Sequence, residues 1–410
     1  MKEIMKKKRM LALSLVFALA LGVSGVIGYG DQNMIARDVF AAGNSTSGPA
    51  VDISPTIPEP VATPTPTATP TPTPKPTKTP KPTPKVTKVT LSCAGDCTIG
   101  TDPAFNYSTS LNAMVKKVKD KGYFFKNVQK YFAKDDMTIV NFEGTLTNRT
   151  TRADKKFTFK GPASFINIIK KGNIESVAFA NNHCKDFGVG SYRDTIDVFK
   201  KNDVKYSSYG TVGTYTVKKN GKKIKIGMIS VNGLEGYTSS ANYIRSGMKK
   251  LKKKKCDLTI VSMHAGIERQ YTPNDTQKSI AHYAVKQGAD LVLGHHPHVL
   301  HGVEKYKGVY IVYSLGNFCF GGNSNPSDKD TMIARPVFSF KNGKLQKKKT
   351  TLKLIPCCLS STTARNNYQP TPKKGKEKSR LLSKINKMCE ALGTTLKNSK
   401  GKLTTTCTKK

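Results

Sequence analysis

Histidines cluster in this chain in a way that favours metal chemistry. All seven lie between His183 and His301, and three of them fall within the segment 295–298. A neutral imidazole offers a lone pair at neutral pH, which makes histidine the commonest metal ligand. The alternative is a set of packed and solvated histidines, and such a narrow distribution argues against it. The sequence therefore predicts a metal site around residues 294–298.

Short apolar runs of the kind that form buried strands each end at a polar residue able to bind a metal. In chain order these residues are Asp96, Glu143, Asn182, His183, His264, His296 and His298. Strand ends in an α/β protein open onto one crevice, so we expect these side chains to converge. Carboxylate, amide and imidazole ligands suit Zn, Mn or Fe, and a central carboxylate would bridge two ions about 3.5–4 Å apart.

The elements that must position these residues follow from hydrophobic periodicity. We expect strands at 89–93, 137–140, 176–180, 258–263, 291–293 and 310–315, and helices at 119–132, 162–169, 191–201, 275–287 and 376–392. Asn220-Gly221 and Asn342-Gly343 stand between alternating runs and predict tight hairpin turns. The last helix carries an apolar stripe that predicts packing against the domain.

An ordered set of short segments carries a family resemblance. The segments are Ala94–Asp96, Asn141–Gly144, Lys156–Phe159, Ala180–His183 with Asp186 and Gly188, His264–Glu268, Gln277, Gly288–Asp290, Gly294–Val299 and Tyr313–Phe318. Together, over Val89–Leu396, they resemble the metallophosphoesterase superfamily and, within it, the poly-γ-glutamate capsule synthesis proteins of the CapA type. The resemblance implies an α/β fold, a four-layer α/β/β/α sandwich of two mixed sheets.

The resemblance also implies roles for single residues. Asp96 and His298 would hold a first metal ion, Glu143 would bridge, and Asn182, His264 and His296 would hold a second ion. His183 would act on the substrate as the catalytic residue. Around these ligands, a supporting or substrate-rim position is expected for Asp186, Glu268, Ser314 and Asn317. Glu268 would either orient His264 or be solvated, and Ser314 and Asn317 would either line the rim or cap the strand.

One departure from the superfamily concerns the first metal ion. The third position of the first motif, usually histidine, is Thr98, and Glu143 stands where aspartate is usual. The first ion is therefore a ligand short, which leaves two ions, one ion or none open. A thiol could replace the missing histidine, because Cys93, Cys97, Cys184 and Cys319 flank the motifs. The alternative is that these cysteines are small buried hydrophobes.

Composition divides the chain into regions. Residues 1–41 combine a basic start with an apolar run and predict a signal peptide, with a cleavage site before Ala42, or a retained membrane anchor. Residues 42–85 are rich in proline, threonine and lysine, which predicts an extended linker. The metallophosphatase-like domain is expected at 86–356 and a C-terminal extension at 357–410. The chain should therefore lie outside the cytoplasm, secreted or membrane-anchored.

The 410 residues carry a formal charge of +41, and 58 of the 68 basic residues are lysine. Without a helix-turn-helix, zinc-finger or RNA-binding signature, specific nucleic-acid binding is not expected. An anionic envelope polymer, poly-γ-glutamate or teichoic acid, is the expected partner, alongside membrane components of a capsule synthase. Two functions stay open: a metal-dependent hydrolase attacking a phosphoester or γ-glutamyl amide, and a non-catalytic polymer-binding component of export or wall attachment.

Overall fold

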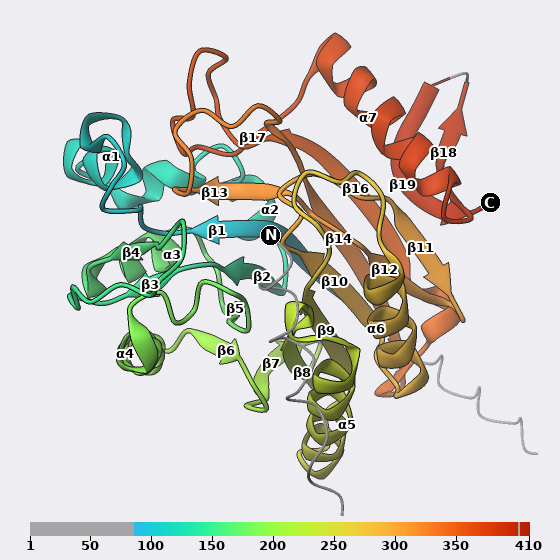
Figure 1. Ribbon diagram of the computed structural model, residues 1–410. Helices are drawn as coiled ribbons and strands as arrows, with labels where there is room; N and C mark the ends of the chain where they lie inside the picture. Colours follow the sequence, from blue (N-terminus) through green and yellow to red (C-terminus); the bar gives the residue numbers. More distant parts are fainter. Residues whose placement is uncertain (1–85, 401) are drawn as a thin grey trace, which may run out of the picture. The chain divides into compact units, whose positions relative to one another are not determined.

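The computed structural model describes residues 86–400 and 402–410 (Figure 1). The expected signal peptide or anchor at 1–41 and the linker at 42–85 lie outside the described residues. Within the described part, no helix has the length and hydrophobicity that crossing a bilayer requires.

A long mixed sheet of eleven strands forms one layer of the fold. Its parallel core is β1 (Val86–Thr98), β2 (Met137–Phe142), β5 (Ser176–Ala178) and β6 (Lys205–Ser207), with β13 (Asn317–Phe320) parallel to the end of β1. Antiparallel strands extend it on the other side of β1: β14 (Asp330–Lys341), β16 (Thr351–Cys358), β19 (Lys402–Lys409) and β18 (Thr394–Ser399). The short strands β15 (Lys344–Leu345) and β17 (Thr371–Pro372) pair with β14 and β16.

A second mixed sheet has six strands in the order β11-β12-β10-β9-β8-β7. Strands β8 (Lys222–Asn232), β9 (Leu258–His264), β10 (Leu291–His295) and β12 (Val309–Val312) are parallel, and the antiparallel β7 (Gly213–Lys219) and β11 (Val303–Tyr306) form its edges. Strands β3 (Thr145–Leu146) and β4 (Lys160–Gly161) form a small separate pair.

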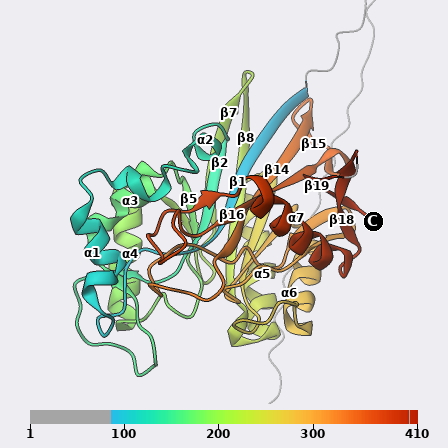
Figure 2. The ribbon, with the colours of Figure 1, turned by 90° about the horizontal axis from the view of Figure 1, so that it is seen from above.

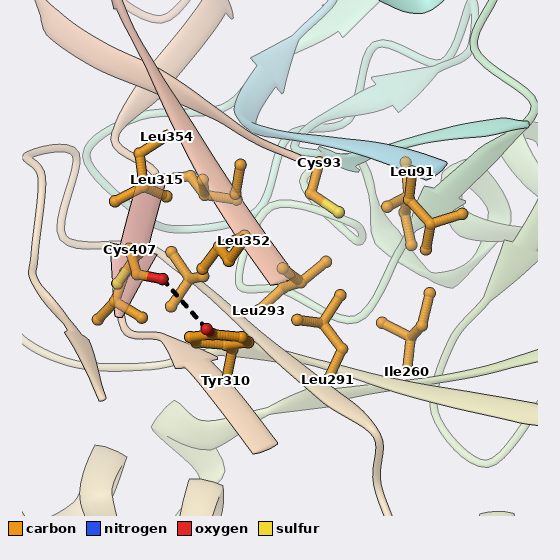
Figure 3. Packing of buried hydrophobic residues seen from close by; sticks show 14 of the residues in the cluster. Leu91, Cys93, Ile260, Leu291, Leu293, Tyr310, Leu315, Leu352, Leu354 and Cys407 are labelled. Atoms are coloured by element: carbon orange, nitrogen blue, oxygen red, sulfur yellow. Dashed lines mark hydrogen bonds between the residues drawn. The ribbon is translucent and has the colours of Figure 1, made fainter. Parts of the chain in front are cut away.

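The main core fills the space between the two large sheets. In Figure 3, Leu91 of β1 and Leu352 of β16 face Ile260, Leu291 and Tyr310 of the second sheet, and the Tyr310 hydroxyl donates to the Cys407 carbonyl at 3.1 Å. Burying these side chains supplies the main driving force for joining the sheets, at roughly 25 cal/mol per Å² of apolar surface.

Helices cover the outer face of each sheet, which completes four layers (Figures 1 and 2). The long sheet packs on α1 (Leu111–Lys117), α2 (Gln129–Phe132), α3 (Ile166–Lys171) and α4 (Gly188–Lys201). The second sheet packs on α5 (Tyr237–Lys253) and α6 (Asp275–Lys286). The expected α/β/β/α sandwich of two mixed sheets is confirmed.

Two helical segments differ from the sequence-based expectation. The helix expected at 119–132 is a 3-10 turn at Lys121–Phe125 followed by the short α2, because Phe124, Phe125 and Phe132 bury their rings without regular helical spacing. Helix α5 was not expected. It buries Ser240, Ala241 and Gly247 beside Ile244 and Leu251, so small residues replace most of the apolar stripe that would have indicated it.

The C-terminal segment joins the same layers. Helix α7 (Gly375–Glu390) buries Leu381, Leu382, Ile385 and Cys389 in the core between the sheets, and β18 and β19 extend the long sheet. The boundary expected between 356 and 357 falls inside β16, whose hydrogen bonds to β14 continue to Cys358.

Candidate metal centre

The predicted ligands meet at the carboxyl ends of the parallel strands of both sheets. Asp96 lies near the end of β1, Glu143 directly follows β2, and His264 ends β9. Asn182 and His183 follow β5, and His296 and His298 follow β10. His298 and Asn182 are partly exposed and the other five are buried. The convergence expected from the strand ends is therefore present in the fold.

Glycines let the backbones around the site approach closely. The Asp96 amide donates to the Gly316 carbonyl at 2.9 Å, and a Cβ at Gly95 would lie 1.8 Å from that oxygen. A Cβ at Gly294 would likewise lie 2.0 Å from the Tyr313 carbonyl oxygen. Any side chain at 95 or 294 would separate these segments, so glycine is required at both positions.

Glu143 lies at the centre of the cluster. Its Oε1 is 3.6 Å from His264 Nε2 and 3.9 Å from both His183 Nε2 and His298 Nε2. The side chain is fully buried, and neither carboxylate oxygen has a hydrogen-bond partner among the described residues. Burial, opposed by the His298 charge and reinforced by nearby carboxylates, raises the pKa of Glu143 to about 8. A buried carboxylate without a partner is costly unless a cation compensates it.

This arrangement fits a bound divalent ion. Two ligand atoms about 2.1 Å from one tetrahedral ion lie roughly 3.4 Å apart, close to the separations around Glu143. Asp96, Glu143 and His298 offer ligand atoms within 4.8 Å of one another, and so do Glu268, His296 and His298. The buried His296 Nδ1 also lacks a hydrogen-bond partner in the described part of the chain. The donor set of imidazole, carboxylate and amide groups suits Zn, Mn or Fe.

Three predicted ligands of the second ion form what we call the His264 half: Asn182, His264 and His296. His264 Nε2 is 2.8 Å from Asn182 Oδ1, and the His264 and His296 ring centroids are 4.8 Å apart. Burial, reinforced by neighbouring histidine charge, holds the pKa of His264 well below its usual value and lowers that of His296 to about 4. Both imidazoles are therefore neutral at pH 7, the form that binds metals.

The two predicted ligands of the first ion form the Asp96 half: Asp96 and His298. His298 Nδ1 is 3.3 Å from Asp96 Oδ2 and 2.9 Å from Asn317 Oδ1. Burial opposes charge on both groups, but Glu143 and Asp96 outweigh it at His298 and raise its pKa to about 9. At Asp96, His295 and His298 outweigh burial and hold the pKa well below its usual value.

Among the described residues, neither Thr98 nor a cysteine replaces the missing histidine in the Asp96 half. Thr98 is fully buried, and its Oγ1 has no hydrogen-bond partner among the described residues. Cys97, Cys184 and Cys319 belong to the apolar cluster under the helices, Cys93 lies between the sheets, and burial raises the pKa of each thiol. No cysteine joins a ligand cluster in the described residues. The hydrophobic explanation for these thiols is the one that the packing favours.

His183 is held from behind by an acidic residue. Its Nδ1 lies 2.8 Å from Asp186 Oδ2, which also accepts the Phe159 amide at 2.6 Å. Lys155 Nζ donates to the other Asp186 oxygen at 2.8 Å and to the Asn182 carbonyl at 2.8 Å. This leaves His183 Nε2 directed toward Glu143. Asp186 is therefore a buried positioning group for His183 and does not line the cavity.

The other expected supporting residues divide between two locations. A cavity of about 490 Å³ opens beside the cluster, and His183, His298, Glu268 and Asn317 line it. Ser314 is buried away from the cavity, where its hydroxyl donates to the Val299 carbonyl at 2.6 Å. The expected contact from Glu268 to His264 is not formed, because Glu268 lies with His296 and His298.

The residue that contacts His264 from behind is Asn141, which the sequence had not assigned. Its Nδ2 donates to Asp96 Oδ1 at 2.9 Å and lies 3.3 Å from His264 Nδ1, so one amide contacts both halves. Asn181 orients that amide, because its Nδ2 donates to Asn141 Oδ1 at 3.3 Å. His295 was also unassigned, and its Nδ1 lies 3.3 Å from Asp96 Oδ1. Their only signal was position, at the strand ends inside the quoted segments.

Comparisons with known proteins identify relatives of this chain. The family model described as "Bacterial capsule synthesis protein PGA_cap" matches residues 90–322. The PGA biosynthesis protein CapA of Bacillus subtilis (strain 168) is 32% identical over 224 residues, which cover 50% of this chain and 59% of that protein. The capsule biosynthesis protein CapA of Bacillus anthracis is 29% identical over 266 residues, which cover 57% of this chain and 60% of that protein. The match thus spans about three fifths of the length of either relative.

Among solved structures, a hypothetical protein from Thermus thermophilus aligns with a TM-score of 0.39 and 13% identity, over 65% of this chain and 99% of that one.

Proposed function

We propose a function on the premise that this chain belongs to the bacterial capsule synthesis family PGA_cap, whose model matches more than half of it. The proposal is a metal-dependent hydrolase that acts on an anionic cell-envelope polymer, with poly-γ-glutamate as the first candidate. The observation that carries it is Glu143, a fully buried carboxylate without a hydrogen-bond partner in the described residues, among three imidazole nitrogens at 3.6–3.9 Å.

The ligands proposed for the centre are Asp96, Glu143, Asn182, His264, His296 and His298. A bound divalent ion would supply Lewis-acid activation of water and of the scissile phosphoester or amide. Asn141 holds Asp96 in place and lies against His264. Asp186 accepts a hydrogen bond from Nδ1 of His183, so Nε2 is free to transfer a proton to or from the reacting group.

The same proposal places the protein outside the cytoplasm. Residues 1–41 would direct export, by cleavage before Ala42 or by retention as an anchor, and residues 42–85 would hold the folded part away from the membrane. Membrane components of a capsule synthase are the proposed protein partners.

Metal content tests the proposal directly. The full-length chain, reconstituted with Mn or Zn, should contain one to two equivalents of ion by plasma mass spectrometry, and His296→Ala should contain less. Activity toward phosphoester and γ-glutamyl substrates should follow the metal content. A folded wild-type chain that takes up neither ion would eliminate the hydrolase proposal.

A second candidate is a non-catalytic component that binds the polymer. The formal charge of +41, mostly from lysine, favours it, because dense positive charge retains polyanions without a catalytic site. Added salt and a metal chelator distinguish the polymer-binding function from the hydrolase function. Polymer retention by lysines should fall steeply with ionic strength, whereas metal-dependent turnover should respond chiefly to a chelator.

A further inference from the structure

The cavity beside the metal centre does not share the strong positive charge of the chain. Of all described lysine and arginine residues, only Arg269 lines it, together with the acidic Glu268 and Asp328. The lysine-rich surface and the cavity are therefore different environments. A polyanion attracted by the surface would meet Arg269 as the one described lysine or arginine side chain where it reaches the ligands.

The backbone of Arg269 is fixed against the histidine ligand loop. Its amide donates to the Pro297 carbonyl at 2.8 Å, and its φ is 63°. Pro297 separates His296 from His298, so Arg269 is tied to the segment that supplies two ligands. This fixes the backbone of Arg269 beside the centre, and its exposed side chain lines the cavity.

The guanidinium of Arg269 has no protein partner within the described residues, whereas Arg149, Arg152 and Arg380 each pair with an aspartate. Both acids of the cavity are engaged elsewhere. Asp328 accepts from Lys384 and from the Tyr271 hydroxyl, each at 2.9 Å. Glu268 is grouped with the candidate ligands His296 and His298. Arg269 is thus the cation of the cavity left to bind a ligand.

Part of the cavity wall is aromatic. Phe105 packs against Phe157 and Phe159 with ring centroids 5.8 and 6.5 Å apart, and Phe159 lies 4.5 Å from the His183 ring. Near these rings, the buried Thr101 lines the cavity with an Oγ1 that has no hydrogen-bond partner in the described part of the chain. The cavity therefore offers the Arg269 guanidinium, a buried hydroxyl without a described partner and an aromatic face.

We propose that Arg269 binds one oxyanion of the substrate, a carboxylate or a phosphate, while an adjacent hydrocarbon segment lies on the Phe105, Phe157 and Phe159 wall. The planar guanidinium fork matches either oxyanion with two parallel hydrogen bonds. A γ-linked glutamate unit carries one carboxylate next to two methylene groups. The carboxylate can bind Arg269 while the methylene groups lie on the aromatic rings. A polyol phosphate unit satisfies Arg269 but presents hydroxyls to the rings. This inference rests on the proposed function and names the substrate feature that the site selects.

Binding without turnover provides the test. We would load the full-length His183→Ala chain with Mn and titrate it calorimetrically with γ-linked triglutamate, its neutral carboxamide analogue and a glycerol phosphate trimer. Arg269→Gln should weaken triglutamate binding about tenfold or more, as expected for one lost charge-assisted pair. Arg269→Lys should recover part of the loss. The matched control is Arg193→Gln, an exposed arginine on α4 that does not line the cavity.

The analogues separate recognition from general damage. The neutral analogue should bind equally to the Arg269→Gln chain and to the parent chain. Preference of the parent for glycerol phosphate, lost in Arg269→Gln, would also support the oxyanion role and identify phosphate as its source. Equal triglutamate binding with and without Arg269, equal loss for charged and neutral ligands, or no binding by the parent would overturn the inference. Arg269-dependent binding without turnover in the wild type would refute the hydrolase proposal alone.

Discussion

The two halves of the candidate centre differ in how completely the chain supplies them. The His264 half has an amide and two imidazoles that burial keeps neutral at pH 7. The Asp96 half has one aspartate and one imidazole, whose pKa of about 9 means that it holds a proton at pH 7. Thr98 supplies no ligand where the superfamily usually has one. One half is therefore ready for an ion, whereas the other must first release a proton.

The difference shows what the surroundings of a histidine do to it. His264 is buried and His298 is partly exposed, both close to Glu143, and His298 also contacts Asp96 and Asn317 through Nδ1. Two carboxylates stabilise the charged form of His298, whereas burial and the neighbouring histidines destabilise that of His264. We infer that the His264 half takes up an ion before the Asp96 half does. Glu143 lies between the two halves and is shared by them.

The largest expected effect follows from replacing Glu143, which both halves share. Glu143→Gln should remove essentially all bound metal and lower turnover by at least about 100-fold, because both ions would lose the bridging carboxylate. The same variant should raise the melting temperature of the metal-free protein, since it removes a buried carboxylate without a partner. Metal analysis and calorimetry with and without chelator measure both effects. A chelated variant that is less stable than the chelated wild type would contradict this account of Glu143.

Substitution within each half tests their inequality. His264→Ala should lose all bound metal, whereas Asp96→Asn should retain about one equivalent, because the complete half does not need Asp96. Plasma mass spectrometry after reconstitution and gel filtration gives both numbers. The control is His282→Ala. It removes a histidine of α6 that contacts Glu304, and it should leave the metal content unchanged. Equal losses in the two ligand variants would mean that the halves act as one unit.

Strand ends made the convergence of the candidate ligands predictable from sequence. Residues 96, 143, 182, 264, 296 and 298 each follow or end an apolar run, and parallel strands in both sheets bring those ends together. Side-chain direction was not predictable. Ser314 turns toward Val299 and Glu268 toward His296 because tertiary packing sets their rotamers, which spacing along the chain does not encode. Asn141 was missed because an amide behind a ligand has no sequence pattern of its own.

The pH dependence of metal uptake should separate the halves further. Above pH 5 the His264 half is already neutral, since the pKa of His296 is lowered to about 4. His298 of the Asp96 half holds its proton until the pH passes about 9, and Glu143, which both halves share, holds its proton until the pH passes about 8. Ion binding must displace these protons, so affinity for the first equivalent should rise up to about pH 8 and affinity for a second equivalent should rise up to about pH 9.

Zinc titration at a series of pH values, with proton release measured in two buffers, provides the measurement. The same two pKa shifts also determine how the stability of the metal-free protein depends on pH. Both pKa values are raised, so with respect to these two groups the metal-free fold is most stable below the unfolded values of about 4.3 and 6.5, and its stability falls as the pH rises toward 9. A second equivalent that binds equally well at pH 6.5 and pH 9 would contradict the protonated Asp96 half.

The smallest expected effect is a gain in bound metal. Thr98→His would restore the ligand usual in the superfamily at a position where the Thr98 hydroxyl has no described partner. We expect metal content to rise by at most one equivalent, with a stability cost of about 1–3 kcal/mol because the larger ring must fit a fully buried site. Thr98→Val is the matched control, since it removes only the hydroxyl and should bind metal as the wild type does. If a folded Thr98→His chain binds no additional ion, the deficit of the Asp96 half must come from the protonated His298 and not from the missing ligand. Titration of the wild type above pH 9 would check this assignment, because only a missing ligand would still limit uptake once His298 is neutral.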